Sequence, residues 1–452
     1  MNIQDRGHFG SKIGIVLATA GSAVGLGNVW RFPYMTGQDG GAAFILLYIG
    51  FVLLLGIPGM VAEFIVGRNA STNAARAYGS LTGHRAWGLV GVMGVVTSTF
   101  ILGFYAVVAG WCLQYLYASI TGQLAGDADY VKTYFAAFSS DLWKPALWGL
   151  TFIGLTHAVV TQGVRKGIER AAKILMPTLF ILLLIIVGAS CMLPGAGAGV
   201  EFLLKPDFSK ITRNVFLDAL GQAFFSLSLG TACLCTYASY FRKDTNLLHA
   251  AGQIALLDLL VAVLAGLMIF PAAFSVGINP DAGPSLIFIT LPNVFNQAFS
   301  SMPLVGYVIS LLFYLLLALA ALTSTISMHE IGTAFFHEEL YLRRRWAAGI
   351  ITILAGIICV LCSLSEGAVP IQLCGMKLLD FFDFVTAQIS MPLGAFLTCI
   401  YVGWVTKRRH VYEEYTNHGT LNKGSVTVWL FIIRFVCPVL IAMIFLHQFG
   451  WI

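Results

Sequence analysis

Long apolar runs separated by short polar stretches dominate the pattern of this 452-residue chain. A membrane-spanning helix needs about 20 consecutive, mostly apolar residues, and longer runs are accommodated by tilt or by extension into the loops. The pattern predicts an all-α polytopic membrane protein with about eleven transmembrane helices. They are expected near residues 12–37, 41–67, 88–121, 145–163, 171–194, 214–241, 248–277, 303–338, 343–362, 376–406 and 425–450.

Composition agrees with a membrane protein. Hydrophobic residues make up 58% of the chain and charged residues only 10%, whereas soluble domains carry about 25% charged residues. Met1–Gly10 is short and polar and leads directly into an apolar run, so we expect no cleavable signal peptide. The nine cysteines are scattered and predict no disulfide framework. We attribute the net charge of +5 to membrane topology and expect a lipid bilayer, not a nucleic acid, as the partner.

Basic residues are distributed unequally between the two sets of loops. With a cytoplasmic N-terminus, the cytoplasmic loops hold eighteen lysines and arginines and the opposite loops hold six. The positive-inside rule therefore predicts that the N-terminus is cytoplasmic. An odd number of spans then places the C-terminal Ile452 outside.

The first apolar run contains residues that disfavour a simple spanning helix. Gly21, Gly25 and Gly27 each weaken a helix by about 1 kcal/mol relative to alanine. Arg31 at membrane depth costs about 2.5–3.5 kcal/mol. A helix that unwinds between the first two glycines would turn free carbonyls toward a polar cavity, where grouped oxygens suit a dehydrated sodium ion. A glycine-rich packing helix would explain the glycines but not Arg31 and the neighbouring Asn28.

The run at 214–241 is interrupted in a similar way, by small and hydroxylated residues between Gly221 and Ala232. Serines alone are weak support, because a hydroxyl can bond to its own helix. Two interrupted helices in corresponding positions, however, indicate an inverted repeat with a binding site near the membrane midplane. We expect a single transporter domain over 1–452, with repeats at 12–194 and 214–406 and an additional helix at 425–450.

The stretch from Gly21 to Pro33, GSAVGLGNVWRFP, resembles the first helix of the neurotransmitter:sodium symporter family. Residues 221–232 and 320–325 resemble the family's sixth and eighth helices, and the likeness extends from Arg6 through the eleventh run. Most members have twelve spans, so the chain resembles a bacterial member with eleven. The resemblance implies a place in the cytoplasmic (inner) membrane, two sodium ions and no organic cofactor. It leaves the oligomeric state open.

The resemblance also implies three groups of binding residues, rich in the oxygen ligands that an alkali cation requires. The first sodium ion would be held, together with the substrate carboxylate, by Ala23, Asn28, Ser226 and Asp258. The second would be held by Gly21, Val24, Ala320, Thr323 and Ser324. The substrate would contact Ala23, Gly25, Gly27, Ile101, Tyr105, Phe225, Ser228, Thr231, Ser324 and Met328.

Gating and charge-balancing residues follow from the same resemblance. Arg31 and Asp383 would approach each other when the outside closes, and Arg6 is a further gating residue. Glu63 would accept backbone N–H groups at a helix break, with a proton relay as the alternative. Asp258 would supply a fixed negative charge where animal members bind chloride, and its protonation could give proton counter-transport. Alternatively, it only forms hydrogen bonds to the first or sixth helix.

Gly25 stands where monoamine transporters of the family carry an aspartate, so a zwitterionic substrate is expected. Ile101, Phe225 and Met328 favour an apolar side chain. The implied activity is chloride-independent, sodium-coupled symport of a neutral, hydrophobic or aromatic amino acid into the cytoplasm by alternating access. An ion channel, or an amino-acid receptor that does not transport, remains as the alternative. An enzyme is not expected, because the chain has no zincin, serine-hydrolase or nucleotide-binding motif.

Overall fold

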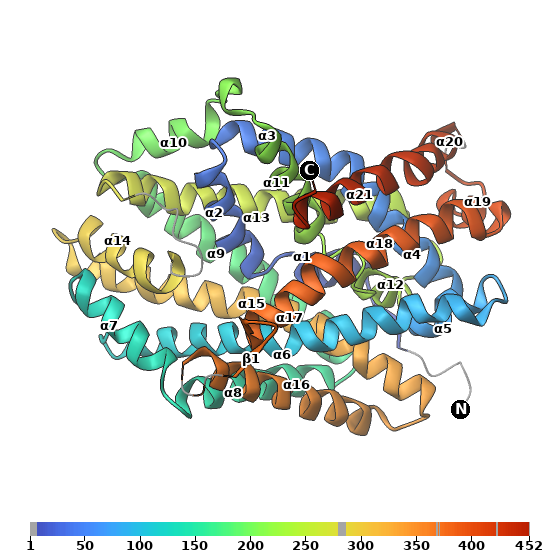
Figure 1. The fold of residues 1–452 in the computed structure, drawn as a ribbon, viewed down its shortest axis with the longest axis horizontal. Coiled ribbons are helices and arrows are strands. Elements are labelled where there is room, and N and C mark those ends of the chain that lie inside the picture. The colour runs from blue at the N-terminus through green and yellow to red at the C-terminus, as the bar shows by residue number, and fades with distance from the viewer. Residues whose placement is uncertain (1–6, 279–285, 368, 370, 422–423, 452) are drawn as a thin grey trace.

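The computed structural model describes residues 7–278, 286–367, 369, 371–421 and 424–451. Long helices run side by side across the molecule, with α7 and α14 near one end and α5 and α19 near the other (Figure 1). The first half of the chain forms α1 (Lys12–Ala23), α2 (Phe32–Gln38), α3 (Ala42–Phe51), α4 (Ile57–Ala70), α5 (Ala74–Ser80), α6 (Gly88–Ile120), α7 (Ala128–Ser139), α8 (Lys144–Val160), α9 (Arg170–Cys191) and α10 (Ala196–Leu204).

The second half is also helical, with one small hairpin. The hairpin consists of β1 (Gln372–Leu373) and β2 (Met376–Lys377), which pair antiparallel. The helices are α11 (Arg213–Ser226), α12 (Cys233–Ala238), α13 (Leu247–Ser275), α14 (Leu291–Ala298), α15 (Pro303–Glu339), α16 (Arg344–Glu366), α17 (Leu378–Asp383), α18 (Met391–Ile400), α19 (Arg408–Tyr415), α20 (Gly424–Phe431) and α21 (Cys437–Gln448).

Short segments of non-α helix join several of these elements. Two are 3₁₀ turns, at Arg85–Trp87 and Phe208–Lys210. The others are π-helical, and most continue an α-helix, so that α3 and α4, for example, form one long element. The π-helical segments are Gly27–Arg31, Val52–Gly56, Val164–Glu169, Leu286–Thr290, Phe384–Ser390, Tyr401–Val405 and Ile432–Val436.

The predicted all-α membrane architecture is confirmed. Within the described residues, eight helices are long and apolar enough to cross a membrane, and a ninth span results if the bent pair Lys12–Ala23 and Gly27–Gln38 is counted as one. The two other expected spans correspond to α8, which has only 17 residues, and to the interrupted pair α11 and α12. The total of eleven and the division into two repeats stay predictions.

The first interruption separates α1 from the helical segment that begins at Gly27, and the two segments meet at an angle of 55°. Val24 has extended backbone torsions (ψ 111°), so its carbonyl no longer points along the helix. The helix resumes at Gly27 with a π-helical turn, and Pro33, which has no N–H to donate, follows that turn in α2. The backbone groups of residues 24–26 therefore bond to side chains of other elements: the Leu26 N–H donates to Tyr105, and the Val24 carbonyl accepts from Ser324.

The second interruption lies between Ser226 and Cys233, where α11 ends and α12 begins. Ser228 (φ 53°), Gly230 (φ 80°) and Ala232 (φ 61°) all adopt the left-handed conformation. That conformation costs a residue with a side chain about 1–2 kcal/mol. Strain of this kind persists where the surrounding structure enforces it, and it is concentrated at functional sites.

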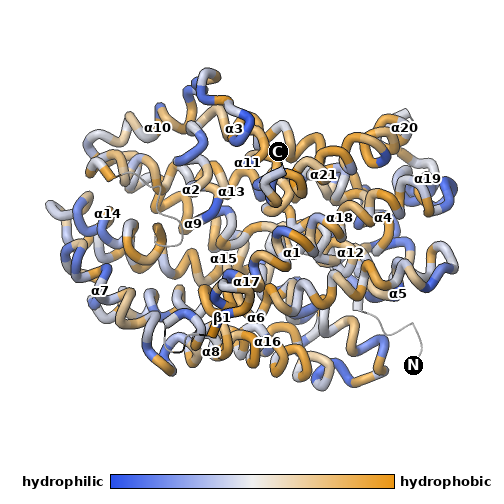
Figure 2. The backbone as a smooth tube through the Cα atoms, viewed as in Figure 1, coloured by the Kyte–Doolittle hydropathy of each residue, from blue (hydrophilic) through white to orange (hydrophobic). Residues whose placement is uncertain are grey.

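The outer surface of the bundle is apolar. The long helices are hydrophobic along most of their length, while hydrophilic residues gather mainly near the two ends of the view (Figure 2). Large side chains such as Ile181 and Leu184 on α9 and Phe431 on α20 are more than half exposed. Water would penalise such a surface, whereas the hydrocarbon core of a bilayer accommodates it.

Candidate functional site

A cavity of about 90 Å³, which we call the central cavity, lies between the two interrupted helices and the long helices α6 and α15. Its wall combines backbone from the first interruption with hydroxyl and apolar side chains. All ten residues that the sequence predicts to contact the substrate line this cavity: Ala23, Gly25, Gly27, Ile101, Tyr105, Phe225, Ser228, Thr231, Ser324 and Met328.

Residues that the sequence did not indicate complete the wall. Phe104 directly precedes the predicted Tyr105 on α6, so its neighbour could have suggested it. Ser98 lies two turns earlier on α6, and its hydroxyl donates to the carbonyl of Thr231 (2.8 Å). Thr386 and Met391 come from the 376–406 run, where nothing in the apolar pattern distinguishes them.

The tightest part of the central cavity surrounds Gly25. The Tyr105 hydroxyl accepts a hydrogen bond from the N–H of Leu26 (3.0 Å) at the first interruption. A Cβ added at Gly25 would lie 2.5 Å from Ser324 Oγ and 3.1 Å from Tyr105 Oη. Only glycine fits here without displacing these groups, so an acidic side chain at this position is excluded by space as well as by sequence.

Three of the four residues predicted to hold the first sodium ion form one buried network, and the fourth, Ala23, lines the central cavity. Asn28 Nδ2 donates to Asp258 Oδ1 (2.7 Å), and Ser226 Oγ donates to Asp258 Oδ2 (2.8 Å). Tyr48 on α3 also donates to Asp258 Oδ2 (3.0 Å), a partner that the sequence did not indicate. The carboxylate at position 258 therefore receives three side-chain hydrogen bonds, which compensate for its burial.

The residues predicted to hold the second sodium ion also lie together. Thr323 Oγ1 donates to the carbonyls of Ala320 (2.8 Å) and Val24 (3.3 Å), and Ser324 Oγ donates to the same Val24 carbonyl (3.2 Å). A Cβ added at Gly21 would lie 3.2 Å from Thr323 Cβ, so α1 approaches α15 closely. Two hydroxyl and two carbonyl oxygens thus converge, a donor set that suits a hard alkali cation.

Glu63 reaches the second interruption from α4. Its Oε1 accepts the N–H of Gly230 (2.7 Å), and its Oε2 accepts the N–H of Cys235 (3.3 Å). These are backbone donors that the interrupted helix leaves without helical partners. The geometry agrees with the predicted interaction at the helix break, and the role of Glu63 in charge balance stays a prediction.

A larger cavity of about 550 Å³, the vestibule, adjoins the central cavity and shares Gly27, Tyr105 and Phe225 with it. The guanidinium of Arg31 lies over the Phe225 ring, 4.3 Å from its centroid. Asp383 lines both cavities, but no ion pair joins it to Arg31 within the described part of the chain. The third predicted gating residue, Arg6, lies outside the described residues.

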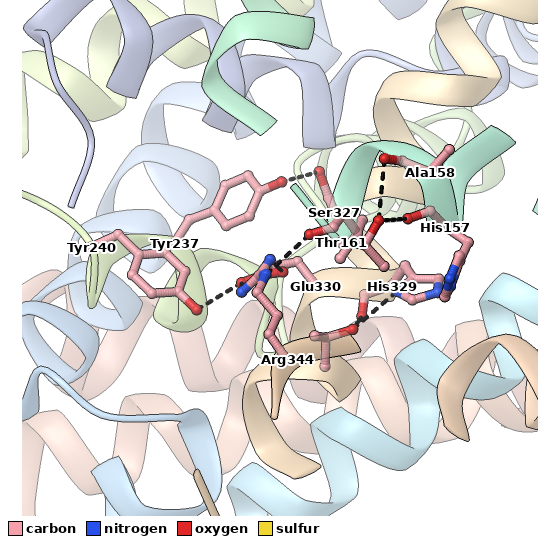
Figure 3. Close-up of polar contacts among 11 residues, drawn as sticks. His157, Ala158, Thr161, Tyr237, Tyr240, Ser327, His329, Glu330 and Arg344 are labelled. Carbon is pink, nitrogen blue, oxygen red and sulfur yellow. Dashed lines mark hydrogen bonds and ion pairs between the residues drawn. The ribbon is translucent and has the colours of Figure 1, made fainter. Parts of the chain in front are cut away.

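A second polar network joins Tyr240, which follows α12, to residues of α15 and α16 (Figure 3). Tyr240 Oη donates to Glu330 Oε1 (2.7 Å), and Arg344 forms an ion pair with the same carboxylate. Arg344 Nε also donates to the carbonyl of Val160 (3.0 Å), so the ends of α8, α15 and α16 are tied together. This network was not predicted from the sequence, although Glu330 lies inside an apolar run and a charge there needs a partner.

Known proteins with similar sequences and folds identify the family. The sodium:neurotransmitter symporter family matches residues 6–136 and 127–450. An uncharacterized sodium-dependent transporter of Bacillus subtilis is 40% identical, with 100% of this chain and 99% of the relative covered. One from Haemophilus influenzae is 34% identical, with 99% of each chain covered. The crystal structure of MhsT in complex with L-phenylalanine has a TM-score of 0.88 at 39% identity, with 98% of this chain and 100% of that chain covered. This chain therefore belongs to the sodium:neurotransmitter symporter family and is a sodium-dependent membrane transporter, not an enzyme.

Proposed function

We propose that this transporter carries a neutral amino acid with an apolar or aromatic side chain into the cytoplasm, together with sodium. The observation that carries the proposal is the central cavity, where polar groups at the first interruption face apolar side chains across a small space. The related MhsT was crystallised with L-phenylalanine, a substrate of this chemistry, and this supports the assignment.

The polar part of the cavity suits a zwitterion. The Tyr105 hydroxyl already accepts the Leu26 N–H, so its own hydrogen is free to donate to a substrate carboxylate. Because Gly25 leaves no room for an acidic side chain, the substrate ammonium must find carbonyl and hydroxyl oxygens instead. Ile101, Phe104 and Met328 then meet the apolar side chain of the substrate.

Coupling between substrate binding and sodium binding follows from residues that belong to both the substrate site and a predicted ion site. Asn28 lines the central cavity and also bonds Asp258, so the predicted first ion site and the substrate site have a wall in common. Ser324 likewise serves both the substrate site and the predicted second ion site. Sodium bound at these oxygens would supply positive charge to a substrate carboxylate, and affinity for each would rise in the presence of the other.

We further propose that Asp258 provides the negative charge that balances bound sodium, so that transport needs no chloride. The carboxylate is buried and held by three donors, which keeps it next to Asn28 and Ser226. A change in its protonation as sodium binds and leaves would give proton counter-transport. Arg31 and Asp383 would close the vestibule during the transport cycle, and Arg6 would be a further gating residue.

We also propose how the protein is oriented in the membrane. The vestibule would face outward and the network around Glu330 would close the cytoplasmic side, in agreement with the basic loops near α5 and α19. The N-terminus would be cytoplasmic, the C-terminus outside, and the membrane the bacterial cytoplasmic one. Alternating access requires the vestibule and this network to lie on opposite sides of the interrupted helices.

Ligand-induced thermal stabilisation of the purified protein tests the proposed substrate class. L-phenylalanine should raise the unfolding midpoint in sodium buffer and have much less effect in potassium buffer. Phenethylamine has the same ring but lacks the carboxylate, and it should give no shift. If the amine stabilised the protein as well as the amino acid, or if sodium made no difference, the proposed substrate and its coupling would both be wrong.

A further inference from the structure

A cavity of about 580 Å³ lies away from the transport pathway, between α19 and the helix formed by α20 and Ile432–Val436. Three of its lining residues are arginines, and most of the others are apolar or aromatic. In Figure 1 the two helices meet at the end of the molecule where α5 also lies. The lining residues, which we call the arginine groove, are Arg408, Arg409, Tyr412, Val426, Thr427, Leu430, Phe431, Arg434 and Phe435.

Arg434 is the unusual member of the arginine groove. It lies well inside the apolar run 425–450, where a charge costs about 2.5–3.5 kcal/mol unless it has partners. Its Nε donates to the carbonyl of Gly403 (2.6 Å), and its guanidinium lies 5.3 Å from the Trp404 ring centroid. The two remaining guanidinium nitrogens have no hydrogen-bond partner among the described residues, so they are available to an anion that enters the groove.

The other charges near the arginine groove leave it positive. Arg409 pairs with Glu413 (2.7 Å), which holds the pKa of that carboxyl below its ordinary value. Glu414 is bound to Arg68 on the far side of α19. Arg408 has no ion pair or hydrogen bond within the described ranges, and no acidic side chain lines the groove there. Arg408 and Arg434 thus carry charge that the protein does not neutralise.

The apolar wall of the groove indicates what kind of anion would fit. The side chains of Phe431 and Phe435 are 58% and 48% exposed, and Phe435 packs edge-on against Trp404 at 5.6 Å. Both rings belong to one helix that is long and apolar enough to cross a membrane, Gly424–Gln448. A soluble anion would leave them uncovered, whereas a phospholipid would place its phosphate on the arginines and its acyl chains along the rings.

We propose that the arginine groove is a binding site for an anionic glycerophospholipid, whose phosphate is held by Arg434 and Arg408. The planar guanidinium of Arg434 is fixed by Gly403 and Trp404, so it can present two parallel N–H groups to phosphate oxygens. The site is separate from the central cavity, and it does not depend on which amino acid is transported.

The test is native mass spectrometry of the delipidated, full-length protein with phosphatidylglycerol or with phosphatidylcholine of the same acyl chains. We expect wild type to retain phosphatidylglycerol at least about tenfold better than phosphatidylcholine. Arg434→Gln and Arg408→Gln should each lower that retention about tenfold, a loss typical of a charge-assisted contact. Arg434→Lys keeps the positive charge but loses the planar set of donors, so it should lower phosphatidylglycerol retention less than Arg434→Gln does. The lysine variant also replaces the glutamine variant if the latter does not fold.

Arg345→Gln is the matched control, because Arg345 is exposed, as Arg408 is, and lies over a tryptophan, as Arg434 does, but outside the groove. It should retain phosphatidylglycerol within about twofold of wild type, since it removes the same charge elsewhere. Equal retention of both lipids, an equal loss in Arg345→Gln, or displacement of the lipid by inorganic phosphate would overturn the proposal. A lipid-free dimer whose formation depends on Arg434 would also overturn it, by assigning the groove to a second copy of the chain.

Discussion

Replacing Asp258 by serine tests whether this carboxylate balances the charge of sodium. The change removes a buried negative charge but leaves its three donors in place: Asn28 Nδ2, Ser226 Oγ and Tyr48 Oη, now 2.7–3.0 Å from the carboxylate oxygens. Three converging donors around the vacated volume form a suitable site for a chloride ion. We therefore expect Asp258→Ser to depend on chloride, whereas wild type does not.

The expected loss can be worked from these contacts. A hydrogen bond to a charged group contributes about 1.5–3 kcal/mol. If the loss of the carboxylate weakens sodium binding by the free energy of one such contact, sodium affinity should fall about tenfold to a hundredfold. Chloride should restore part of that loss, because it returns a negative charge to the same volume. Asp258→Asn is the control: it fills the volume with a neutral amide, so chloride should not rescue it.

The assay is sodium-driven uptake by proteoliposomes, with chloride or gluconate as the anion, for wild type and both variants. Wild type should be equally active in both anions. At a sodium concentration near the half-saturating value of wild type, uptake by Asp258→Ser should be strongly reduced in gluconate and partly restored in chloride, whereas uptake by Asp258→Asn should be strongly reduced in both. Chloride-dependent uptake by wild type, or full activity of the serine variant in gluconate, would refute the reasoning.

Three further predictions concern other parts of the molecule. Thr323→Ala combined with Ser324→Ala removes two hydroxyls from the predicted second ion site. The sodium concentration needed for half-maximal substrate binding should then rise at least about tenfold, and an unchanged sodium dependence would contradict the assignment. Arg31→Lys keeps the charge but loses the planar fork, so uptake rate should fall more than equilibrium binding, and an equal fall in both would argue against a gating role. Glu330→Gln breaks a buried ion pair and should lower the free energy of unfolding by about 3–5 kcal/mol, measured as a lower thermal midpoint. Glu201→Gln breaks the exposed pair with Lys205 and should leave the midpoint almost unchanged, so equal shifts in the two variants would contradict the role given to the buried pair.

The spanning helices could be predicted from the sequence because hydrocarbon imposes a simple requirement on them. Each needs about 20 apolar residues, and the observed helices begin and end within a few residues of the expected ranges. The short helices were not predicted. For example, α7 lies in the segment 122–144, which is too polar to span a membrane. Its start depends on local capping, in which Asp127 accepts the N–H of Tyr130 (2.9 Å).

The candidate site, too, was predicted from the sequence only in part. Asn28, Ser226 and Asp258 are far apart in sequence, yet the family resemblance placed them together, and they share one hydrogen-bond network. Tyr48 was not expected, since nothing in its own apolar run distinguishes a tyrosine that donates to a distant carboxylate. Arg31 lies over Phe225 without an ion pair to Asp383, because contact between two predicted gating residues depends on the conformation and not on the residue types alone.

Sodium-driven accumulation of radiolabelled L-phenylalanine in proteoliposomes tests the central claim most directly. With sodium outside, potassium inside and gluconate as the anion, we predict uptake that transiently exceeds the equilibrium level set by equal sodium on both sides. Accumulation should disappear when potassium replaces external sodium. Uptake that only reaches equilibrium faster would indicate a channel, and sodium-dependent binding of L-phenylalanine without any uptake would indicate a receptor; either result would contradict coupled symport.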